Sequence, residues 1–205
     1  MNVTALIWDF DGTLVDSYEA IGEALQATYA HYGLDFDEEW VMAFIIKESV
    51  QALLYQVAKE HHLDFAALSA FFKKEQEARD DKIKSMPHLV EVLAATKAKG
   101  INHFVYTHKG ITVNDVLERF GVRQYIIEVV TSANGFARKP SPEVIDYGID
   151  KYHLDKARTY YVGDRRLDVE AAENAGIPSL NLGQPFSANN QHIEDLSDII
   201  RLFEV

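Results

Sequence analysis

The sequence predicts an α/β fold: a Rossmann-like parallel sheet core with an inserted α-helical cap of four helices. Two observations lead to this prediction. From Pro87 onward, strand-like and helix-like segments alternate, which is typical of a parallel sheet covered by helices. Before Pro87 lies a purely helical block, and that block follows one apolar strand near the start of the chain. The helical block is therefore expected to interrupt the α/β domain.

The expected α/β core comprises residues 1–14 and 87–205, and the expected cap comprises residues 15–86. The first strand is the apolar run Val3–Trp8. Within the cap, apolar residues recur at helical spacing in four segments with short connections, which favours a small bundle. Side chains that commonly cap helices precede three of these segments: Ser17, Asp37 and Asp64.

Strands and helices take turns in the second part of the core. Strands are expected at 101–106, 126–130, 159–162 and 179–182, and helices at 87–99, 112–120, 142–152 and 168–175. A final helix carries Leu196, Ile199, Ile200 and Phe203. Right-handed crossovers bring the carboxyl ends of such strands to one edge of the sheet, where open α/β sheets bind their ligands.

Composition and charge narrow the classes of function. The 205 residues carry a formal net charge of −12 and include no cysteine. Such a charge repels polyanions, so nucleic acid and anionic membranes are not expected partners. No apolar run is long enough to cross a bilayer, and the first residues lack the basic segment and cleavage site of a signal peptide. We therefore expect a cytoplasmic protein that is a monomer or a weak homodimer.

Two carboxylates stand where the first strand ends. Asp9 and Asp11 directly follow the apolar run and precede Gly12. Alternate residues of an extended chain lean the same way, so both side chains are expected at the binding edge of the sheet. There they can bind a hard divalent cation, or divide the roles of nucleophile and acid. The simpler alternative is a polar strand end with an Asp-Gly turn.

Three further strand ends carry polar groups. Thr107 precedes main-chain amides that can hold a phosphoryl oxygen, Lys139 stands before a helix, and Asp164 and Asp168 flank a turn. Each has a simpler explanation by itself. Thr107 and Asp168 can act as caps, and Lys139 can be a solvated surface charge. Taken together with the first carboxylate pair, these groups predict one site around a divalent metal.

This ordered set resembles the haloacid dehalogenase superfamily, in its phosphatase branch. The run Asp9-Phe10-Asp11-Gly12-Thr13 matches the first motif of that family in full, and the Leu14-Val15-Asp16-Ser17 that follows looks like the phosphoglycolate-phosphatase-like group. Thr107, Lys139 and the segment from Gly163 to Asp168 fill the other motif positions in order. The resemblance implies a helical cap inserted after the first motif.

Three positions depart from the family pattern. His108 stands where asparagine is common, Arg165 where a small hydroxyl residue is common, and His88 where glycine is common. None of these changes removes an essential group. His108 and Arg165 are close enough to the motifs to alter the choice of substrate.

The resemblance implies a Mg²⁺-dependent phosphatase of a small phosphorylated metabolite. Asp9 would attack phosphorus and form an aspartyl-phosphate, while Asp11 would protonate the leaving alcohol and then activate water. Mg²⁺ would be held by Asp9, by the main-chain carbonyl of Asp11 and by Asp164.

Five other residues receive supporting roles. Thr107, His108 and Lys139 would bind the phosphoryl group or the substrate, and Asp168 would support Lys139 or the metal shell. In the cap, Lys47 would meet a carboxylate or a second phosphate of the substrate. An ordinary surface lysine at Lys47 is the alternative.

Two other functions stay open at this stage. A sugar phosphomutase like β-phosphoglucomutase can use the same residues, provided that its cap excludes water. A non-catalytic binding protein could keep the fold without turnover, although the intact acids argue against it. The presence of Asp11 favours phosphate chemistry over dehalogenation, because a dehalogenase has no alcohol to protonate.

Overall fold

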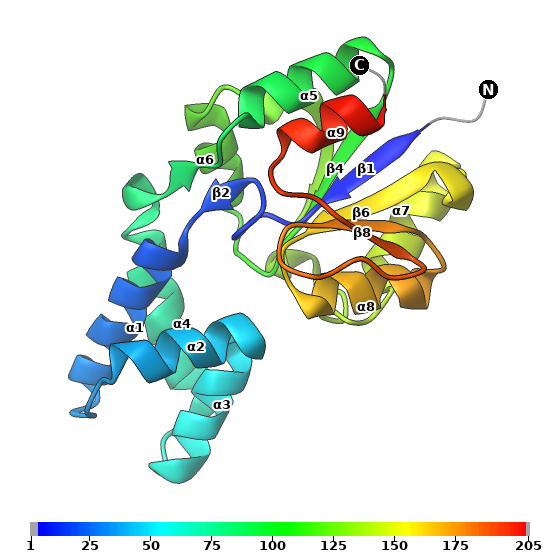
Figure 1. Ribbon diagram of the computed structural model, residues 1–205. Helices are drawn as coiled ribbons and strands as arrows, with labels where there is room; N and C mark the ends of the chain where they lie inside the picture. The colour runs from blue at the N-terminus through cyan, green and yellow to red at the C-terminus, as the bar shows by residue number, and fades with distance from the viewer. Residues whose placement is uncertain (1–3, 204–205) are drawn as a thin grey trace. The chain divides into compact units, whose positions relative to one another are not determined.

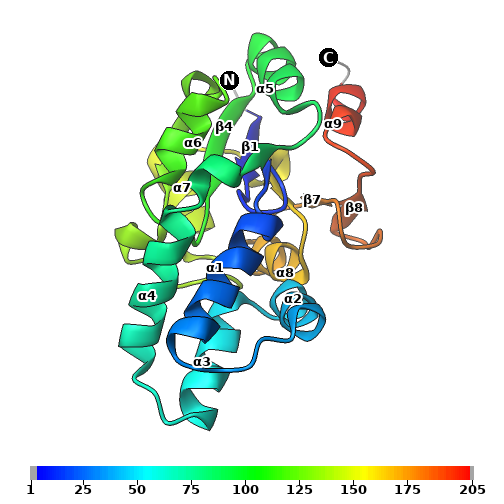
Figure 2. The same ribbon diagram turned by 90° about the vertical axis from the view of Figure 1, so that its left-hand side faces the viewer.

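The structure is a computed structural model that describes residues 4–203 (Figures 1 and 2). Val3, which the sequence assigns to the first strand, lies outside the described residues. The chain forms two compact units. One unit combines the residues up to Asp16 with those from Lys84 onward, and the other spans Ser17–Ile83. The predicted α/β class with a parallel sheet is confirmed.

The first unit is built on a sheet whose order is β5-β4-β1-β6-β7-β8. The strands are β1 (Ala5–Trp8), β4 (Asn102–Tyr106), β5 (Ile126–Val130), β6 (Thr159–Gly163), β7 (Ser179–Asn181) and β8 (Asn190–His192). Each neighbouring pair in this sheet is parallel. The first strand thus lies in the interior of the sheet, between β4 and β6, which explains its near-continuous apolar character.

Helices cover both faces of this sheet, as Figure 1 shows. They are α5 (Leu89–Ala98), α6 (Val113–Arg119), α7 (Glu143–Tyr152), α8 (Arg166–Ala175) and α9 (Ser197–Leu202). Apolar side chains of α7 and α8, among them Ile145 and Ala172, pack against Ile7 and Tyr161 on one face. Helix α5 lies beside α9 and contacts β4 on the other face. Single turns of 3₁₀ helix complete the connections at Arg123–Tyr125, Ser132–Asn134 and Lys156–Arg158.

A buried polar trio joins α5 to the sheet. The indole Nε1 of Trp8 donates a hydrogen bond to Nδ1 of His103 over 3.1 Å. The other ring nitrogen, Nε2, lies 3.1 Å from the hydroxyl of Thr96, which itself donates to a carbonyl of its own helix. His103 therefore accepts at Nδ1 and donates at Nε2, as a neutral imidazole does. Burial, with a smaller effect of Lys97, lowers the pKa of His103 to about 4.

A two-stranded antiparallel sheet stands where the helical insert leaves and rejoins the first unit. It consists of β2 (Val15–Asp16) and β3 (Lys84–Ser85), with Val15 opposite Ser85. The amide of Met86 extends this pairing by donating to the carbonyl of Leu14 over 3.1 Å. Strands of two residues are too short to produce a periodic pattern, so the sequence did not indicate them.

The second unit is the predicted set of four helices, within a segment that the structure describes throughout. They are α1 (Tyr18–His31), α2 (Glu38–Lys47), α3 (Val50–Glu60) and α4 (Phe65–Glu77), with one 3₁₀ turn at Asp80–Lys82. Helix α1 packs along α4 (Figure 2), and their core includes Leu25, Val41, Leu53 and Leu68. Asp37 and Asp64 cap α2 and α4 as expected. Ser17 precedes α1 but makes no capping bond, so that expectation is wrong, because its backbone is already helical rather than extended.

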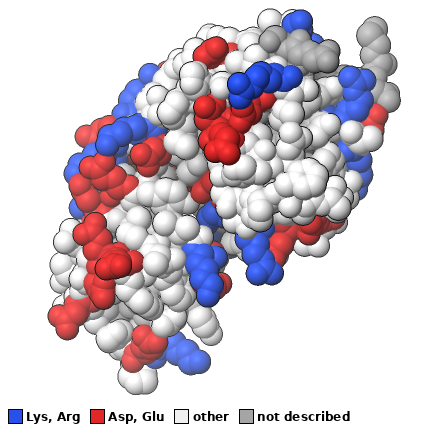
Figure 3. All heavy atoms as spheres, in the orientation of Figure 1, with Lys and Arg blue, Asp and Glu red and all other residues white. Residues whose placement is uncertain are grey.

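Two general properties concern possible partners. No helix in the described residues has the length and apolar character needed to cross a membrane. On the face drawn in Figure 3, acidic and basic side chains are interspersed over the surface. This face shows no broad basic area, in keeping with the excess of acidic residues in the sequence.

Candidate active site

The sheet order brings three predicted strand ends together. Asp9 follows β1, Thr107 follows β4, and Asp164 follows β6. Because β1 pairs with both β4 and β6, these residues meet at the carboxyl edge of the sheet. This juxtaposition requires only parallel pairing and short strands, which is why the sequence could predict it.

The loop after β1 turns back on itself. The carbonyl of Phe10 accepts the amides of Leu14 and Val15 over 3.0 and 3.1 Å, and the amide of Gly12 donates to the carbonyl of Val15 over 2.8 Å. Gly12 has a φ of +79°, a conformation that residues with a side chain rarely adopt. The tight turn leaves Asp9 buried, with 2 % exposure, and Asp11 half-buried.

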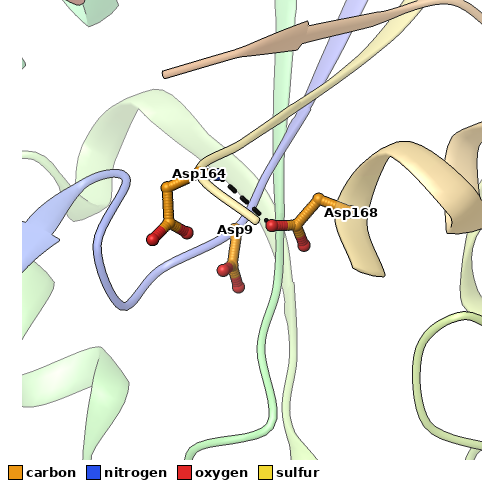
Figure 4. A group of neighbouring side chains, drawn as sticks. All are labelled: Asp9, Asp164 and Asp168. Carbon is orange, nitrogen blue, oxygen red and sulfur yellow. Dashed lines mark hydrogen bonds between the residues drawn. The ribbon is translucent and has the colours of Figure 1, made fainter. Parts of the chain in front are cut away.

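Asp9 forms a group of three converging carboxylates with Asp164 and Asp168 (Figure 4). One oxygen from each lies within 4.8 Å of the others. The Oδ1 atom of Asp9 is 2.8 Å from the ammonium of Lys139, whereas its Oδ2 atom is buried and has no hydrogen-bond partner among the described residues. Burial raises the pKa of Asp9, Lys139 opposes this effect, and repulsion from Asp168 adds to it. The site thus carries more negative charge than Lys139 offsets.

Lys139 is a buried cation at the centre of the site. Its Nζ atom lies 2.8 Å from Asp9 and 2.7 Å from Asp168, and 5.2 and 5.4 Å from the ring centres of Tyr106 and Tyr161. Burial works against the charge, but the two carboxylates raise the pKa of Lys139 well above its ordinary value. The lysine is therefore an ammonium ion at neutral pH. Its burial excludes the alternative of a solvated surface charge.

Asp168 uses both carboxylate oxygens. Oδ1 accepts from Lys139, and Oδ2 accepts the main-chain amides of Asp164 and Arg165 over 3.3 and 3.0 Å. A Cβ atom at Gly163 would lie 2.4 Å from the Cβ of Asp168, so only glycine fits this close approach. Asp168 thus does more than cap α8: it joins the lysine to the loop that carries Asp164.

A sequence profile of the haloacid dehalogenase-like hydrolases matches residues 6–182. The chain belongs to this family. It is 24% identical to the pyrophosphatase PpaX of Oceanobacillus iheyensis, over 98% of this chain and 97% of that protein. It is 26% identical to a phosphoglycolate phosphatase of Yersinia pseudotuberculosis, over 88% of this chain and 81% of that one.

A solved structure has the same fold. A haloacid dehalogenase-superfamily hydrolase of Geobacter sulfurreducens superposes with a TM-score of 0.75 at 23% identity. The match covers 98% of this chain and 96% of that one. The similarity of fold therefore covers the helical insert as well as the sheet. The family match and the named relatives confirm the resemblance that the sequence motifs indicated.

The three carboxylates Asp9, Asp164 and Asp168 of this haloacid dehalogenase-like hydrolase fit a metal ion. Their donors are all oxygen, the preference of hard divalent cations, and the unpartnered Oδ2 of Asp9 is a vacant donor within the group. The oxygens of Asp168 already accept three hydrogen bonds, so Asp9 and Asp164 are the better ligands. Burial, and then repulsion from Asp168 and Asp164, raise the pKa of Asp9, and a bound cation would oppose both effects.

The remaining predicted residues lie in different surroundings. The hydroxyl oxygen of buried Thr107 accepts the amide of Lys109 over 3.0 Å, in a turn that follows β4. His108 accepts a hydrogen bond at Nε2 from the main-chain amide of Lys139 over 3.1 Å. Lys47 is the last residue of α2, in the helical unit, and its side chain is 81 % exposed beside Glu48. The roles assigned to these residues stay predictions.

Sequence reasoning assigned no role to Thr13. Its buried hydroxyl donates to Oδ1 of Asp164 over 3.3 Å, across 151 positions of the chain. The bond orients a candidate metal ligand from the loop after β1. The signal in the sequence is the position of this threonine within the first motif, two residues after Asp11.

Proposed function

We propose that this hydrolase is a Mg²⁺-dependent phosphatase that acts on a small phosphorylated metabolite through an aspartyl-phosphate on Asp9. The observation that carries the proposal is the buried contact of Asp9 Oδ1 with Lys139, together with the buried Oδ2 of Asp9, which has no hydrogen-bond partner within residues 4–203. The names of the two relatives, a phosphoglycolate phosphatase and a pyrophosphatase, support phosphate chemistry.

Asp9 is the nucleophile in this scheme. Its carboxylate attacks phosphorus, the bond from phosphorus to the leaving oxygen breaks, and Asp9 becomes an acyl phosphate. Lys139 fixes the carboxylate through Oδ1 and contributes a positive charge where the phosphoryl group enters. Because Lys139 and Asp9 are both buried, their geometry is set before substrate binds.

Asp11 carries the proton in both half-reactions. It gives a proton to the leaving oxygen, which departs as an alcohol, and then takes a proton from the water that attacks the acyl phosphate. Water supplies the oxygen of the released phosphate, and Asp9 returns as a carboxylate. The half-burial of Asp11 at the tip of its loop is consistent with a group that exchanges protons with substrate and water.

Charge neutralisation decides whether a phosphate dianion can approach. Asp9, Asp164 and Asp168 repel it, and Lys139 offsets only part of this repulsion. Asp9, Asp164 and the main-chain carbonyl of Asp11 would hold Mg²⁺, which would supply the further positive charge that a phosphate dianion needs there. Thr107, at the end of the neighbouring strand, orients the phosphoryl group for in-line transfer.

The expected setting of the enzyme follows from composition and size. We infer a cytoplasmic monomer or weak homodimer that binds neither nucleic acid nor membranes. The net charge of −12 and the lack of cysteine support this inference.

The proposal is tested by phosphate release from a panel of phosphorylated metabolites and from p-nitrophenyl phosphate. Asp9→Asn should lower kcat by about a thousandfold or more, since it removes the nucleophile at constant volume. Asp150→Asn, the same exchange at an exposed position of α7, should leave kcat unchanged. Mass spectrometry after acid quenching should find one phosphoryl group on the wild type and none on Asp9→Asn.

Two results would overturn the proposal. Full activity of Asp9→Asn would remove the nucleophile from the scheme. Transfer of phosphate between positions of a hexose phosphate, without release of phosphate, would identify a phosphomutase instead.

A further inference from the structure

Two side chains at the end of β4 hold the main chain that leads into Lys139. The hydroxyl of Tyr106 donates to the carbonyl of Ala137 over 3.1 Å, and Nε2 of His108 accepts the amide of Lys139 over 3.1 Å. These bonds lie on the two sides of Arg138 and span 31 positions of the chain. The main chain on both sides of Arg138 is thus held against the end of β4, next to the residue whose side chain enters the site.

Tyr106 also contacts the side chain whose main chain it holds. The centre of its ring lies 5.2 Å from the Lys139 ammonium, a distance at which an aromatic ring attracts a cation. Tyr161 lies on the other strand beside β1, 5.4 Å from the same ammonium, and its hydroxyl donates to the carbonyl of Tyr106 over 3.4 Å. The ammonium is therefore positioned by aromatic rings as well as by carboxylates.

His108 has one protonation state that suits its bond. To accept an amide proton at Nε2, the imidazole must be neutral and carry its proton on Nδ1. Burial and the positive charges of Lys139, Arg138 and Arg165 lower the pKa of His108 to about 2. The Nε2 acceptor of His108 is consequently available at neutral pH.

We propose that Tyr106 and His108 are positioning residues that place Lys139 against Asp9 and Asp168. The inference rests on the proposed function, and it assigns His108 a different task from contact with substrate. Thr107 lies between the two positioning residues. Three consecutive residues would therefore supply the hydroxyl that orients the phosphoryl group and the two side chains that position the Lys139 ammonium.

The test compares His108→Gln with His108→Asn. Oε1 of glutamine is separated from Cα by the same number of bonds as Nε2 of histidine, so it can accept the Lys139 amide. The acceptor of asparagine is one bond shorter, at the position of Nδ1. Both replacements are neutral amides, so a difference between them reports the reach of the acceptor and not charge or polarity.

The first readout needs no substrate. Hydrogen exchange at the Lys139 amide should be slow in the wild type and in His108→Gln, and faster by about tenfold or more in His108→Asn. A long-range ¹H–¹⁵N correlation spectrum should show His108 as the tautomer protonated at Nδ1. Equal exchange in all three proteins, or a proton on Nε2, would overturn the proposal.

The second readout is kinetic, with p-nitrophenyl phosphate. His108→Asn should lower kcat and kcat/KM together by about tenfold, because the lost interaction matters in the transition state, and KM should stay constant. His108→Gln should restore most of kcat. A rise in KM alone would identify His108 as a substrate contact and overturn the positioning role.

Tyr106→Phe provides an independent variant that keeps the aromatic ring. It should lower kcat several-fold, through loss of the bond to Ala137. The control is Tyr152→Phe, which removes a tyrosine hydroxyl bonded to Glu128 over 2.9 Å and should not affect kcat. Equal kcat values in both variants would count against the positioning role of Tyr106.

Failure of this inference differs from failure of the proposed function. If the wild type releases no phosphate while the exchange pattern is as expected, the proposed function fails and the contact of His108 with Lys139 stands. If the wild type is active and the three proteins do not differ in exchange or kcat, only the positioning role fails.

Discussion

Asp168 Oδ1 lies 2.7 Å from Lys139 Nζ, and neither side chain is exposed to solvent. The second oxygen of Asp168 is bound to two main-chain amides of the loop after β6. One carboxylate therefore connects the cation of the site to the segment that carries Asp164. This connection leads to the first prediction.

We expect Asp168→Asn to lower both kcat and stability. An amide has one acceptor oxygen, so it can serve either Lys139 or the two main-chain amides, but not both. Its NH₂ group then faces a donor, and the buried ammonium loses one of its two counter-charges. Breaking a buried ion pair costs about 3 to 5 kcal/mol, which denaturant unfolding should detect.

Asp146→Asn is the matched control for this prediction. Asp146 pairs with Lys156 over 3.2 Å at a half-exposed position, where an ion pair contributes little. Unchanged stability of Asp168→Asn, or an equal effect of both variants, would contradict the role given to Asp168.

Phosphate release should depend on Mg²⁺ and be inhibited by Ca²⁺. Calcium prefers more oxygen ligands at longer distances, which disturbs the carboxylate that must attack. Added Mg²⁺ should also raise the Tm of the wild type but not that of Asp164→Asn, which supplies a readout independent of turnover. Full activity after exhaustive chelation would exclude the metal assignment.

Stability should fall on acidification through His103. Its pKa is about 4 in the folded protein, against an ordinary value of 6.5, so the unfolded chain binds the proton first. The contribution is complete above pH 6.5 and is lost as the pH falls toward 4, by up to about 3 kcal/mol. Chemical unfolding at a series of pH values measures this loss.

His103→Asn should flatten that part of the pH profile, because its Oδ1 can still accept from Trp8 but does not titrate. The same exchange at the exposed His192 should leave the profile as in the wild type. An unchanged profile in His103→Asn would show that other groups cause the acid sensitivity.

Lys47→Ala tests substrate recognition in the helical unit. We expect KM for an anionic metabolite to rise by about tenfold, the effect of losing about 1.4 kcal/mol of binding. The rate with p-nitrophenyl phosphate should hold, since that leaving group has no anionic substituent. Lys59→Ala, at another exposed position of the same unit, serves as control.

Two outcomes would remove Lys47 from substrate recognition. Equal losses on both substrates would indicate a role in folding of the helical unit. No change on either would leave an ordinary surface lysine, which its exposure of 81 % also allows.

The parts of the site that the sequence predicted are those fixed by strand order. Asp9, Thr107 and Asp164 directly follow apolar strands, and parallel pairing then brings them together. Lys139 is expected at the same edge because it follows the strand 126–130 and stands before a helix, but residues 131–138 separate it from the end of β5. Its contact with Asp9 and Asp168 depends on packing that no local pattern encodes.

The parts that sequence reasoning missed depend on main-chain partners or on very short elements. His108 binds the amide of a residue 31 positions away, and an amide has no identity in the sequence. Strand β8, Asn190–His192, is three polar residues without alternation. Such elements form because a neighbouring edge is available to them.

The pairing of Val15 with Ser85 has a consequence for how this enzyme could change its substrate range. The chain leaves the first unit after Asp16 and rejoins it at Lys84, and these two residues are paired. A turn of a few residues could therefore connect them without moving the strands of the larger sheet. We therefore expect that the segment Ser17–Ile83 can be replaced by another insert. Such a replacement at the same pair of short strands should leave Asp9, Lys139 and Asp168, which belong to the first unit, in place.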